Sequence, residues 1–541
     1  MAVNVPGLIA VIVFYIIIFI VGLFAARKKK SGDEAVGGEG EEVMLAGRNV
    51  GLFVGTFTMT ATWVGGGFTN GTAESVYVSG LVWAQAAWCY SASLIIGGLI
   101  FAKKMREKGY VTMVDPLQEK FSPWMGGLLY IPGFLGEIMY VAAILGALGS
   151  TLGVILDLNI DLAVIFSAVI AVGYTCFGGL YSVMYTDVLQ LGFIFVGLWL
   201  STPFIMKSEH ATVASESWVG TLEKQQVGEW IDLALLLTIG GMPWQAYFQR
   251  VLSSKSPERA QILSIVGGFG CLVLSIPPVL IGAIAKSTDW SSLNISFELM
   301  DDNSTLADSR LVLPLVMQYL TPQWVSFLGL GAISAAVMSS ADSTVLSASS
   351  IFGYNIYKLI IRPKASEREL VWVIRIGIFF VGALSTVMAL TIKSIYTLWA
   401  LCSDLVYVIM FPQLLCAIYV PSVNTYGSFL AFAIGLILRF GGGEPTVGLP
   451  SFIKYPLYDE NLKKQLFPFR TLSMLVSLVT LILVSYAAEI LFKKFQLSKR
   501  FDVFHVFKEE KEDTVTLKRF NGNQDEIVSK DPNDNSAAHR F

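Results

Sequence analysis

Charged residues are scarce in this chain. Lys, Arg, Asp and Glu make up only 15% of its 541 residues, while apolar residues make up 54%. Because soluble globular domains carry about 25% charged residues, this composition excludes an ordinary soluble protein. It predicts a polytopic membrane protein that is surrounded by lipid and has no nucleic-acid partner.

Histidine and cysteine are also scarce. The three histidines (His210, His505 and His539) lie in loops or near the C-terminus, which excludes a histidine proton relay through the membrane. Since no nucleophile–base pattern stands out either, we expect no catalytic residue and no enzyme activity. The five cysteines lie in or beside apolar runs, without the spacing of a disulfide framework or a metal site: Cys89, Cys176, Cys271, Cys402 and Cys416.

Long hydrophobic runs, in contrast, are abundant. About thirteen of them recur between residues 8 and 492, and roughly 20 apolar residues suffice to cross a hydrocarbon core of about 30 Å. In the first run, residues 8–26, the charges follow the apolar stretch, which favours an uncleaved anchor over a signal peptide. We expect an all-α polytopic membrane protein with about 13 transmembrane helices over residues 1–494. The more charged residues 495–541 are predicted to form a disordered cytoplasmic tail.

Basic segments predict the orientation of the chain, because cytoplasmic loops are enriched in Lys and Arg. They follow alternate hydrophobic runs, which predicts an extracellular N-terminus and a cytoplasmic C-terminus. The loop near residues 285–311 carries acceptor patterns for N-glycosylation at Asn294 and Asn303, in agreement with an extracellular face. A third match at Asn70 lies too close to an interrupted span to be predicted as a glycan site. The basic segments are 27–30, 103–108, 250–259, 358–368 and the tail from Lys493.

Two hydrophobic runs contain sequences that interrupt a helix. Residues 58–67 (TMTATWVGGG) include three consecutive glycines, and residues 240–247 (GGMPWQAY) include two glycines and a proline. Unwound backbone within a membrane is tolerated mainly where it lines a cavity. Two breaks five spans apart are typical of transporters built from inverted repeats, with the substrate between the broken helices. We expect the two core repeats at about residues 48–207 and 229–420.

Aromatic residues accompany both breaks. Trp63 lies in the first and Trp244 in the second, while Tyr90, Tyr140 and Trp399 lie in other spans at positions compatible with the same cavity. A box of aromatic rings binds a quaternary ammonium group by cation–π attraction, worth about 2 kcal/mol or more per desolvated contact. A single aromatic residue in a membrane protein more often faces lipid or the interface. The prediction of a box therefore depends on convergence of the rings.

Carboxylates within apolar runs are costly and mark candidate functional sites. Asp342 lies on a span where serines recur at every fourth position, and a stripe of hydroxyls with one carboxylate suits sodium. Serines also pack membrane helices closely, which explains the stripe but not Asp342. Glu137 lies three residues before Tyr140 and so can place negative charge beside a cationic ligand. Asp187 fits an interfacial carboxylate at the cytoplasmic end of its span, and Asp404 is the fourth candidate.

Five segments carry a family resemblance: 60–67 (TATWVGGG), 178–187 (GGLYSVMYTD), 243–250 (PWQAYFQR), 335–342 (AAVMSSAD) and 403–407 (SDLVY). With these segments, residues 7 to about 492 resemble the sodium/solute symporter family and, within it, members that import choline. The resemblance implies a thirteen-helix, 5+5 inverted-repeat transporter with a leucine-transporter-like core. It also implies sodium-coupled, chloride-dependent choline uptake across the plasma membrane for acetylcholine synthesis, in presynaptic terminals and synaptic vesicles of cholinergic neurons.

The same resemblance implies roles for individual residues. A choline box is expected at Trp63, Tyr90, Tyr140, Trp244 and Trp399, where Tyr140 replaces a tryptophan of the family and offers a weaker ring quadrupole. One sodium site is expected at the carbonyl groups of Ala61 and Val64 with the hydroxyls of Ser339 and Ser340. A second sodium site is expected to involve Asp187 and Asp342. No residue is assigned to chloride.

Two alternatives stay open from the residues themselves. One is a sodium symporter for another small solute, although a sugar site would need amides and charges where these breaks offer rings. The other is a choline-gated channel or sensor, which would be lined by polar rings repeated across subunits. The sequence does not determine the oligomeric state, and a homo-oligomer is one of the possibilities.

Overall fold

The computed structural model describes residues 5–29, 39–176, 180–210, 218–293, 300, 306–495 and 498–507. Nearly all regular elements of these residues are helices, together with a small hairpin of β1 (Tyr458–Asp459) and β2 (Lys464–Gln465). Nine helical stretches of the described chain are long and apolar enough to cross a membrane, and two shorter apolar helices accompany them. The predicted all-α membrane fold is confirmed, while the total of thirteen spans stays a prediction.

Long helices make up most of the bundle: α1 (Val5–Lys29), α5 (Gln85–Gly97), α8 (Pro123–Leu156), α9 (Ile160–Thr175), α10 (Leu180–Met206), α14 (Pro257–Lys286), α16 (Gln323–Ile351), α17 (Glu367–Thr391), α20 (Thr425–Gly441) and α21 (Phe469–Glu489). The shorter helices α18 (Ile395–Leu405) and α19 (Phe411–Tyr419) together form one further span. Short helices connect them: α2 (Glu39–Leu45), α6 (Lys103–Glu107), α7 (Asp115–Phe121) and α15 (Val312–Tyr319). Four π-helical stretches extend or join the long ones: η3 (Gly98–Ala102), η8 (Phe352–Ile361), η9 (Val406–Met410) and η11 (Ile490–Lys494).

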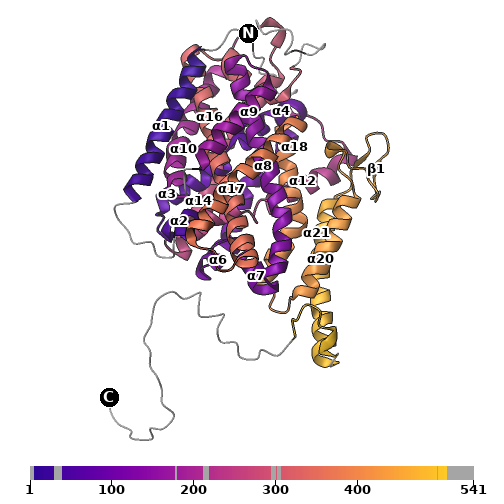
Figure 1. Cartoon of the computed structure of the whole chain (residues 1–541). Coiled ribbons are helices and arrows are strands. Elements are labelled where there is room, and N and C mark those ends of the chain that lie inside the picture. The colour runs from indigo at the N-terminus through magenta and orange to yellow at the C-terminus, as the bar shows by residue number, and fades with distance from the viewer. Residues whose placement is uncertain are drawn as a thin grey trace, which may run out of the picture.

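Helix α16 lies at the centre of the bundle. It packs against α1, α8, α10 and α17, and every side chain from Gly329 to Ile351 is buried. Helices α1 and α21 lie on opposite flanks (Figure 1) and expose large apolar side chains such as Phe24 and Leu483. Exposed apolar side chains on outer helices are expected where lipid surrounds the protein. The polar stripe of α16 is therefore kept away from lipid.

The first predicted helix break is present. Helix α3 (Leu52–Trp63) ends at Trp63 and α4 (Gly66–Ser79) begins at Gly66, with extended backbone at Gly65 (φ −96°, ψ −169°). Close packing explains the glycine, because a Cβ atom at Gly65 would lie 1.6 Å from the hydroxyl oxygen of Ser340. The break therefore forms where α16 approaches the backbone of the first broken helix.

The second predicted break separates α12 (Val227–Ile239) from α13 (Gln245–Ser253). A Cβ atom at Gly240 would lie 2.7 Å from the carbonyl oxygen of Ser403 in α18. Pro243 lies between the two halves and has no N–H to continue the helical ladder. Both breaks thus combine a glycine at a close helix contact with backbone that leaves the helical path.

The C-terminal segment differs from its predicted disorder at its start. Residues 502–507, which we call the tail latch, fold back onto the bundle. Buried Asp502 accepts hydrogen bonds from the Tyr426 hydroxyl (2.9 Å) and the Phe507 N–H (2.7 Å). The Phe504 ring centroid lies 4.7 Å from that of Tyr426 and 5.3 Å from that of Trp124. The physical reason is composition, since residues 501–507 (FDVFHVF) are mostly apolar; residues 508–541 lie outside the described chain, and their disorder stays a prediction.

We expect Phe504→Ala to loosen the tail latch. Loss of a partly buried ring costs about 1–2 kcal/mol, and about 1.4 kcal/mol makes a local opening roughly ten times more populated. Trypsin cleavage after the exposed Arg500, followed by mass spectrometry, should therefore become about tenfold faster. Phe495→Ala is the matched control, because the Phe495 side chain is 70% exposed. Equal cleavage rates in the two variants would contradict this role of Phe504.

Candidate functional site

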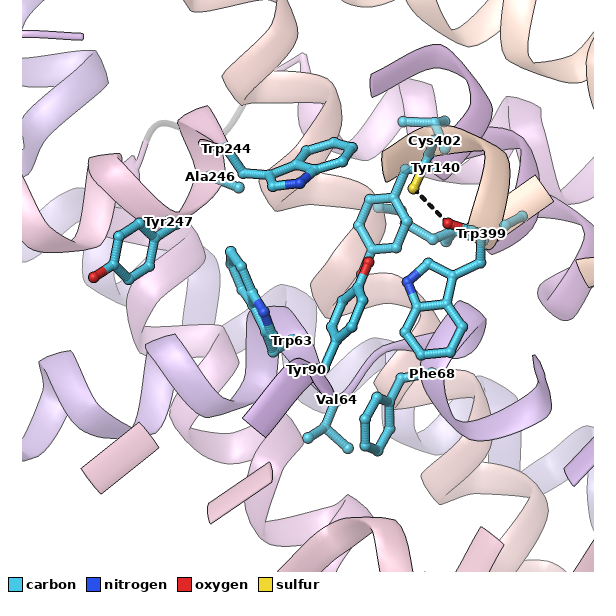
Figure 2. Close-up of a cluster of buried hydrophobic side chains, with 14 of the residues drawn as sticks. Trp63, Val64, Phe68, Tyr90, Tyr140, Trp244, Ala246, Tyr247, Trp399 and Cys402 are labelled. Carbon is cyan, nitrogen blue, oxygen red and sulfur yellow. Dashed lines mark hydrogen bonds between the residues drawn. The ribbon is translucent and has the colours of Figure 1, made fainter. Parts of the chain in front are cut away.

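The five aromatic residues predicted to form a box come from five different helical segments. The ring centroids of Tyr140 and Trp244 are 5.8 Å apart, those of Trp63 and Tyr90 are 6.5 Å apart, and those of Tyr90 and Trp399 are 4.4 Å apart. Figure 2 shows Trp63, Tyr90, Tyr140 and Trp244 around a common space, with Trp399 beside Tyr90. The structure therefore brings all five residues together at the level of the two helix breaks.

A small cavity lies between the rings. Trp399 does not line it; its ring packs beside Tyr90 and 5.8 Å from the ring of Phe68. The cavity measures about 10 Å³, which is room for about one water molecule. A larger ligand therefore enters only when the rings move apart. The lining residues, two of which the sequence did not single out, are Thr62, Trp63, Tyr90, Tyr140, Trp244 and Ala246.

The indole nitrogens around this cavity differ in their hydrogen bonding. Trp244 Nε1 donates to the carbonyl oxygen of Gly240 at 2.8 Å. Trp63 Nε1 and Trp399 Nε1 are buried and have no partner among the described residues. A buried polar group without a partner costs about 1–3 kcal/mol. Trp63 lines the cavity, so its indole N–H is a donor available to a ligand that carries an oxygen atom, in a site made mostly of ring faces.

The oxygen atoms predicted to hold a first sodium ion lie where α3 ends. Because the helix stops at Trp63 and Val64 is its C-terminal cap, carbonyl groups of Ala61 and Val64 lie beyond the regular hydrogen-bond ladder. On α16, the Ser340 hydroxyl lies 3.4 Å from the carbonyl oxygen of Thr62. Ser339 instead donates to Asp187 Oδ1 at 2.6 Å. The structure thus places Ser340 at the helix end and connects Ser339 to Asp187.

Asp187 is fully buried, so its interpretation as an interfacial carboxylate was wrong. Its Oδ2 atom accepts from the Thr58 hydroxyl and pairs with Arg250 Nη2 at 3.2 Å, while Oδ1 is held by Ser339. Arg250 Nη2 also donates to the Ser343 hydroxyl at 2.5 Å. Both carboxylate oxygens of Asp187 therefore already have protein partners in this structure.

The assignment of Arg250 to a cytoplasmic basic segment was also wrong, because Arg250 lies within α13 and its side chain is completely buried. A buried charge is costly unless it is paired, and Asp187 supplies the pair. One sequence signal could have found it. Seven helical residues after Pro243 cover only about 10 Å, which is less than half of a core of about 30 Å. A residue so close to a break still lies within the membrane.

Among the described residues, neither Asp342 nor Glu137 forms a close ion pair, although Arg250 lies near enough to attract the charge of Glu137. Asp342 Oδ1 accepts from the Thr175 hydroxyl at 2.8 Å, and Glu137 Oε1 accepts from the Ser347 hydroxyl at 3.0 Å. The other oxygen of each carboxylate, Oδ2 of Asp342 and Oε2 of Glu137, is buried without a hydrogen bond from the described chain. Each of these two buried carboxylates thus has one oxygen atom without a hydrogen bond from the described residues.

Comparison with known proteins identifies the family of the chain. Residues 43–435 match the sodium:solute symporter family. The chain belongs to this family. It is 54% identical over 508 residues to high-affinity choline transporter 1 of Drosophila melanogaster, covering 93% of this chain and 81% of that relative. It is 51% identical over 549 residues to high affinity choline transporter 1 of Homo sapiens, covering 98% and 94%.

Family membership confirms that the chain is a transporter and not an enzyme, and that sodium is the coupling ion of its family. A solved structure agrees in fold. The substrate-bound outward-open state of a Na+-coupled sialic acid symporter aligns with a TM-score of 0.71 at 15% identity, covering 89% of this chain and 97% of that chain. The helical bundle interrupted by two breaks is therefore a sodium-coupled symporter fold.

The fourth carboxylate of the symporter, Asp404, belongs to a structural charge network. Its Oδ2 atom accepts from Arg439 Nε at 2.6 Å and from Arg470 Nε at 3.1 Å. Both arginines also pair with Glu444, at 2.8 and 3.0 Å. Arg470 also pairs with Asp232 of α12 at 3.8 Å. Three acids and two bases thus tie α18 to α12, α20 and α21. Sequence reasoning missed these partners, because they are 35 and 66 residues away from Asp404.

The three glycosylation patterns of the symporter have different outcomes. Asn294 and Asn303 lie outside the described residues, so their glycosylation stays a prediction. Asn70 lies within α4 and is only 2% exposed. A glycan needs an accessible side chain, so the burial of Asn70 supports its exclusion from the predicted glycosylation sites.

We expect Gly65→Ala to reduce sodium-dependent uptake by this symporter at least about tenfold. The added Cβ atom would lie 1.6 Å from the Ser340 hydroxyl oxygen, and overpacking of this kind typically costs about 1–3 kcal/mol and shifts backbone. Gly173→Ala is the matched control, because nothing lies within 4 Å of a Cβ atom there. Uptake is normalised to the amount of protein at the cell surface. Normal uptake by Gly65→Ala would contradict close contact between the first break and α16.

Proposed function

We propose that this symporter takes up choline across the plasma membrane, coupled to sodium and dependent on chloride, and so supplies choline for acetylcholine synthesis. The observation that carries the proposal is the convergence of Trp63, Tyr90, Tyr140 and Trp244 on one cavity. Ring faces attract a quaternary ammonium group, which has no N–H to donate. The unpartnered indole nitrogen of Trp63, which lines the cavity, matches the hydroxyl group at the other end of choline. Relatives named high-affinity choline transporter, at 54% and 51% identity, support the same substrate.

The closed cavity calls for alternating access. Choline is far larger than one water molecule, so the rings part to admit it and close around it. Trp63 and Trp244 each lie at a helix break, where one half of a helix can tilt relative to the other. Tyr90 and Tyr140 come from the continuous helices α5 and α8 and form the opposite wall. Trp399 supports this wall through its contact with Tyr90.

Two sodium sites are part of the proposal. The carbonyl groups of Ala61 and Val64 with the hydroxyls of Ser339 and Ser340 form the first, next to the break that carries Trp63. Asp342 contributes its free oxygen to the second, and Asp187 stabilises it through Ser339 and Arg250. Oxygen ligands of this kind suit a hard monovalent cation. Sodium at the end of α3 would hold the break in the shape that closes on choline.

The remaining elements of the proposal rest on the family resemblance and on the relatives. They are a chloride requirement with no assigned residue, and glycosylation at Asn294 and Asn303. They also include an extracellular N-terminus with a cytoplasmic C-terminus, and residence in presynaptic terminals and synaptic vesicles of cholinergic neurons. A tail from residue 508 into the cytoplasm would suit control of trafficking.

Coupling decides how far choline can accumulate. The membrane potential contributes about 2.3 kcal/mol per charge per 100 mV, which concentrates a monovalent cation roughly 40-fold without any cotransport. Each sodium ion adds the same electrical contribution and its own gradient. A channel or sensor for choline cannot exceed the electrical limit, whereas a sodium symporter can.

The test is uptake of labelled choline into cells that express the chain, with external sodium present or replaced. Accumulation beyond roughly 40-fold at 100 mV, lost without sodium and lost in Trp63→Ala and Asp342→Ala, supports the symporter and both sites. Trp324→Ala is the control for the first variant, because that side chain is 55% exposed. Choline binding without accumulation would favour a channel or sensor, and no interaction with choline would favour a symporter for another solute.

A further inference from the structure

The aromatic cavity presents no carboxylate to a cationic ligand, since none is among its lining residues. On α8 the nearest acidic side chain is Glu137, one helical turn before Tyr140. Its neighbour Gly136 packs directly on the cavity wall. A Cβ atom there would lie 3.4 Å from the Trp244 ring and 2.6 Å from the Cys402 carbonyl oxygen. Glu137 therefore lies beside the ring site without being part of it.

Charge balance singles out Glu137 and Asp342. Three buried carboxylates of the described chain lie on α16 or accept from its serines, namely Asp342, Asp187 and Glu137. Arg250 forms an ion pair with Asp187 and attracts Glu137 only from a longer distance. Glu137 and Asp342 each keep an oxygen with no partner in the described chain. A buried and unpaired carboxylate costs several kcal/mol, so such groups are retained where a cation visits them. The proposed function provides two kinds of cation, sodium and the organic substrate.

The surroundings separate the two carboxylates. Asp342 contacts the Thr175 hydroxyl and lies on the serine stripe of α16, which offers the oxygen ligands that sodium prefers. Glu137 follows Gly136, where a Cβ atom would lie 3.4 Å from the Trp244 ring, and precedes Tyr140 by one turn. Ring faces next to a carboxylate suit an organic cation better than a small hydrated ion.

The direction of α8 locates Glu137 along the transport path. The helix begins at Pro123, at the end of the molecule where α6, with its basic residues, and α7 lie (Figure 1). Glu137 precedes Tyr140 in α8 and so lies on that side of the rings, the side predicted to face the cytoplasm. We propose that Glu137 is a second, release-side subsite that receives the quaternary ammonium group as it leaves the rings. This inference rests on the proposed function.

The physical reason for such a subsite is the cost of moving a bare organic cation through a low-dielectric interior. Cation–π contacts at the rings are lost when the substrate leaves, and water has not yet replaced them. A carboxylate one turn away offers a second favourable position, and movement between two moderate sites is faster than escape from one deep site. The Ser347 hydroxyl holds Oε1 at 3.0 Å and leaves Oε2 free for the substrate.

The test compares two single variants of the full chain, Glu137→Gln and Asp342→Asn, and measures three quantities for each. These are equilibrium binding of labelled choline to purified protein in sodium, the maximal rate of choline uptake, and the sodium concentration that gives half-maximal uptake. For Glu137→Gln we expect the maximal rate to fall about tenfold, which corresponds to about 1.4 kcal/mol in the barrier. Binding should change less than threefold and the half-maximal sodium concentration less than twofold. Glu137→Asp should recover part of the rate, and Asp342→Asn should instead raise the half-maximal sodium concentration severalfold.

Other outcomes overturn the subsite in distinguishable ways. A tenfold loss of equilibrium binding in Glu137→Gln would place the carboxylate in the ring site itself. A parallel loss of binding, rate and sodium response would mean that Glu137 only maintains the fold. An unchanged rate would remove Glu137 from the path while leaving the proposed function intact. No choline uptake by the unsubstituted chain would overturn both proposals.

Discussion

Arg250→Met is expected to leave little folded protein at the membrane and to reduce uptake by more than about tenfold. The substitution removes the positive charge that pairs with Asp187 at 3.2 Å, in a place where both side chains are completely inaccessible. Removing one partner of a buried ion pair costs about 3–5 kcal/mol, a large share of a typical stability of about 5–15 kcal/mol. Thermal stability of detergent-solubilised protein and surface expression measure the loss. Arg259→Met, in the same basic segment but exposed, is the matched control and should change neither.

The double variant Asp187→Asn with Arg250→Met separates pairing from other roles of the arginine. When Asp187 is replaced by the uncharged asparagine, the loss of Arg250 no longer leaves an unpaired buried charge. The double variant should therefore be more stable than Arg250→Met alone, and the difference gives a coupling energy between the two residues. A loss of thermal stability in the double variant that equals the sum of the losses in the two single variants would contradict an energetically important pair. Ser339 loses its carboxylate acceptor in the double variant, so sodium-dependent uptake is not expected to return with stability.

The residues that sequence analysis placed correctly are those whose effect on the backbone is local. Three consecutive glycines after Trp63 and a proline before Trp244 disfavour a helix whatever surrounds them, and both breaks are present. The aromatic residues were chosen because they accompany these breaks and lie in neighbouring spans. Four of them line the cavity, whereas Trp399 contacts Tyr90 from outside it, and their role in binding stays a prediction.

The residues that sequence analysis misplaced depend on partners far along the chain. Arg250 has the same appearance as the lysines and arginines of a cytoplasmic loop until Asp187, 63 residues away, is seen beside it. Asp404 was a candidate functional carboxylate, but two distant arginines pair with it. The tail latch was missed for a related reason, since the surface that receives Phe504 is assembled from Trp124, Tyr426 and Phe429 in two separate helices. The pattern of charges in a sequence predicts on average which residues lie in loops. The position of an individual residue depends on the side chains that pack against it.

These contacts assign different tasks to neighbouring polar groups of α16. Ser340 lies against the end of α3, Ser339 and Ser343 hold the Asp187–Arg250 pair, and Ser347 holds Glu137. One helix therefore touches the first break, the arginine of the second broken helix and the acid beside the rings. A change in sodium occupancy at α16 would reach both halves of the substrate site through direct contacts, which is what coupling requires.

Choline is expected to compete for the site far better than its uncharged dimethylbutanol isostere, in which carbon replaces the ammonium nitrogen. Both molecules bury nearly the same apolar surface and carry the same hydroxyl group. Only choline gains cation–π attraction, about 2 kcal/mol for each desolvated ring. Two engaged rings give about 4 kcal/mol, or roughly a thousandfold difference in the concentration that inhibits labelled choline uptake by half.

The ratio of the two half-inhibitory concentrations, isostere to choline, identifies in substituted variants the rings that provide the cation–π attraction. Trp63→Leu should reduce the preference for choline over the isostere about 30-fold, which corresponds to one ring contact of about 2 kcal/mol. Trp63→Phe keeps a ring face and should retain most of the preference. Trp324→Leu, at a position that is 55% exposed, should leave the ratio unchanged. An isostere that competes as well as choline in the unsubstituted protein would mean that the rings act only as apolar surface, and the charge of the substrate would then have to be recognised by a carboxylate instead.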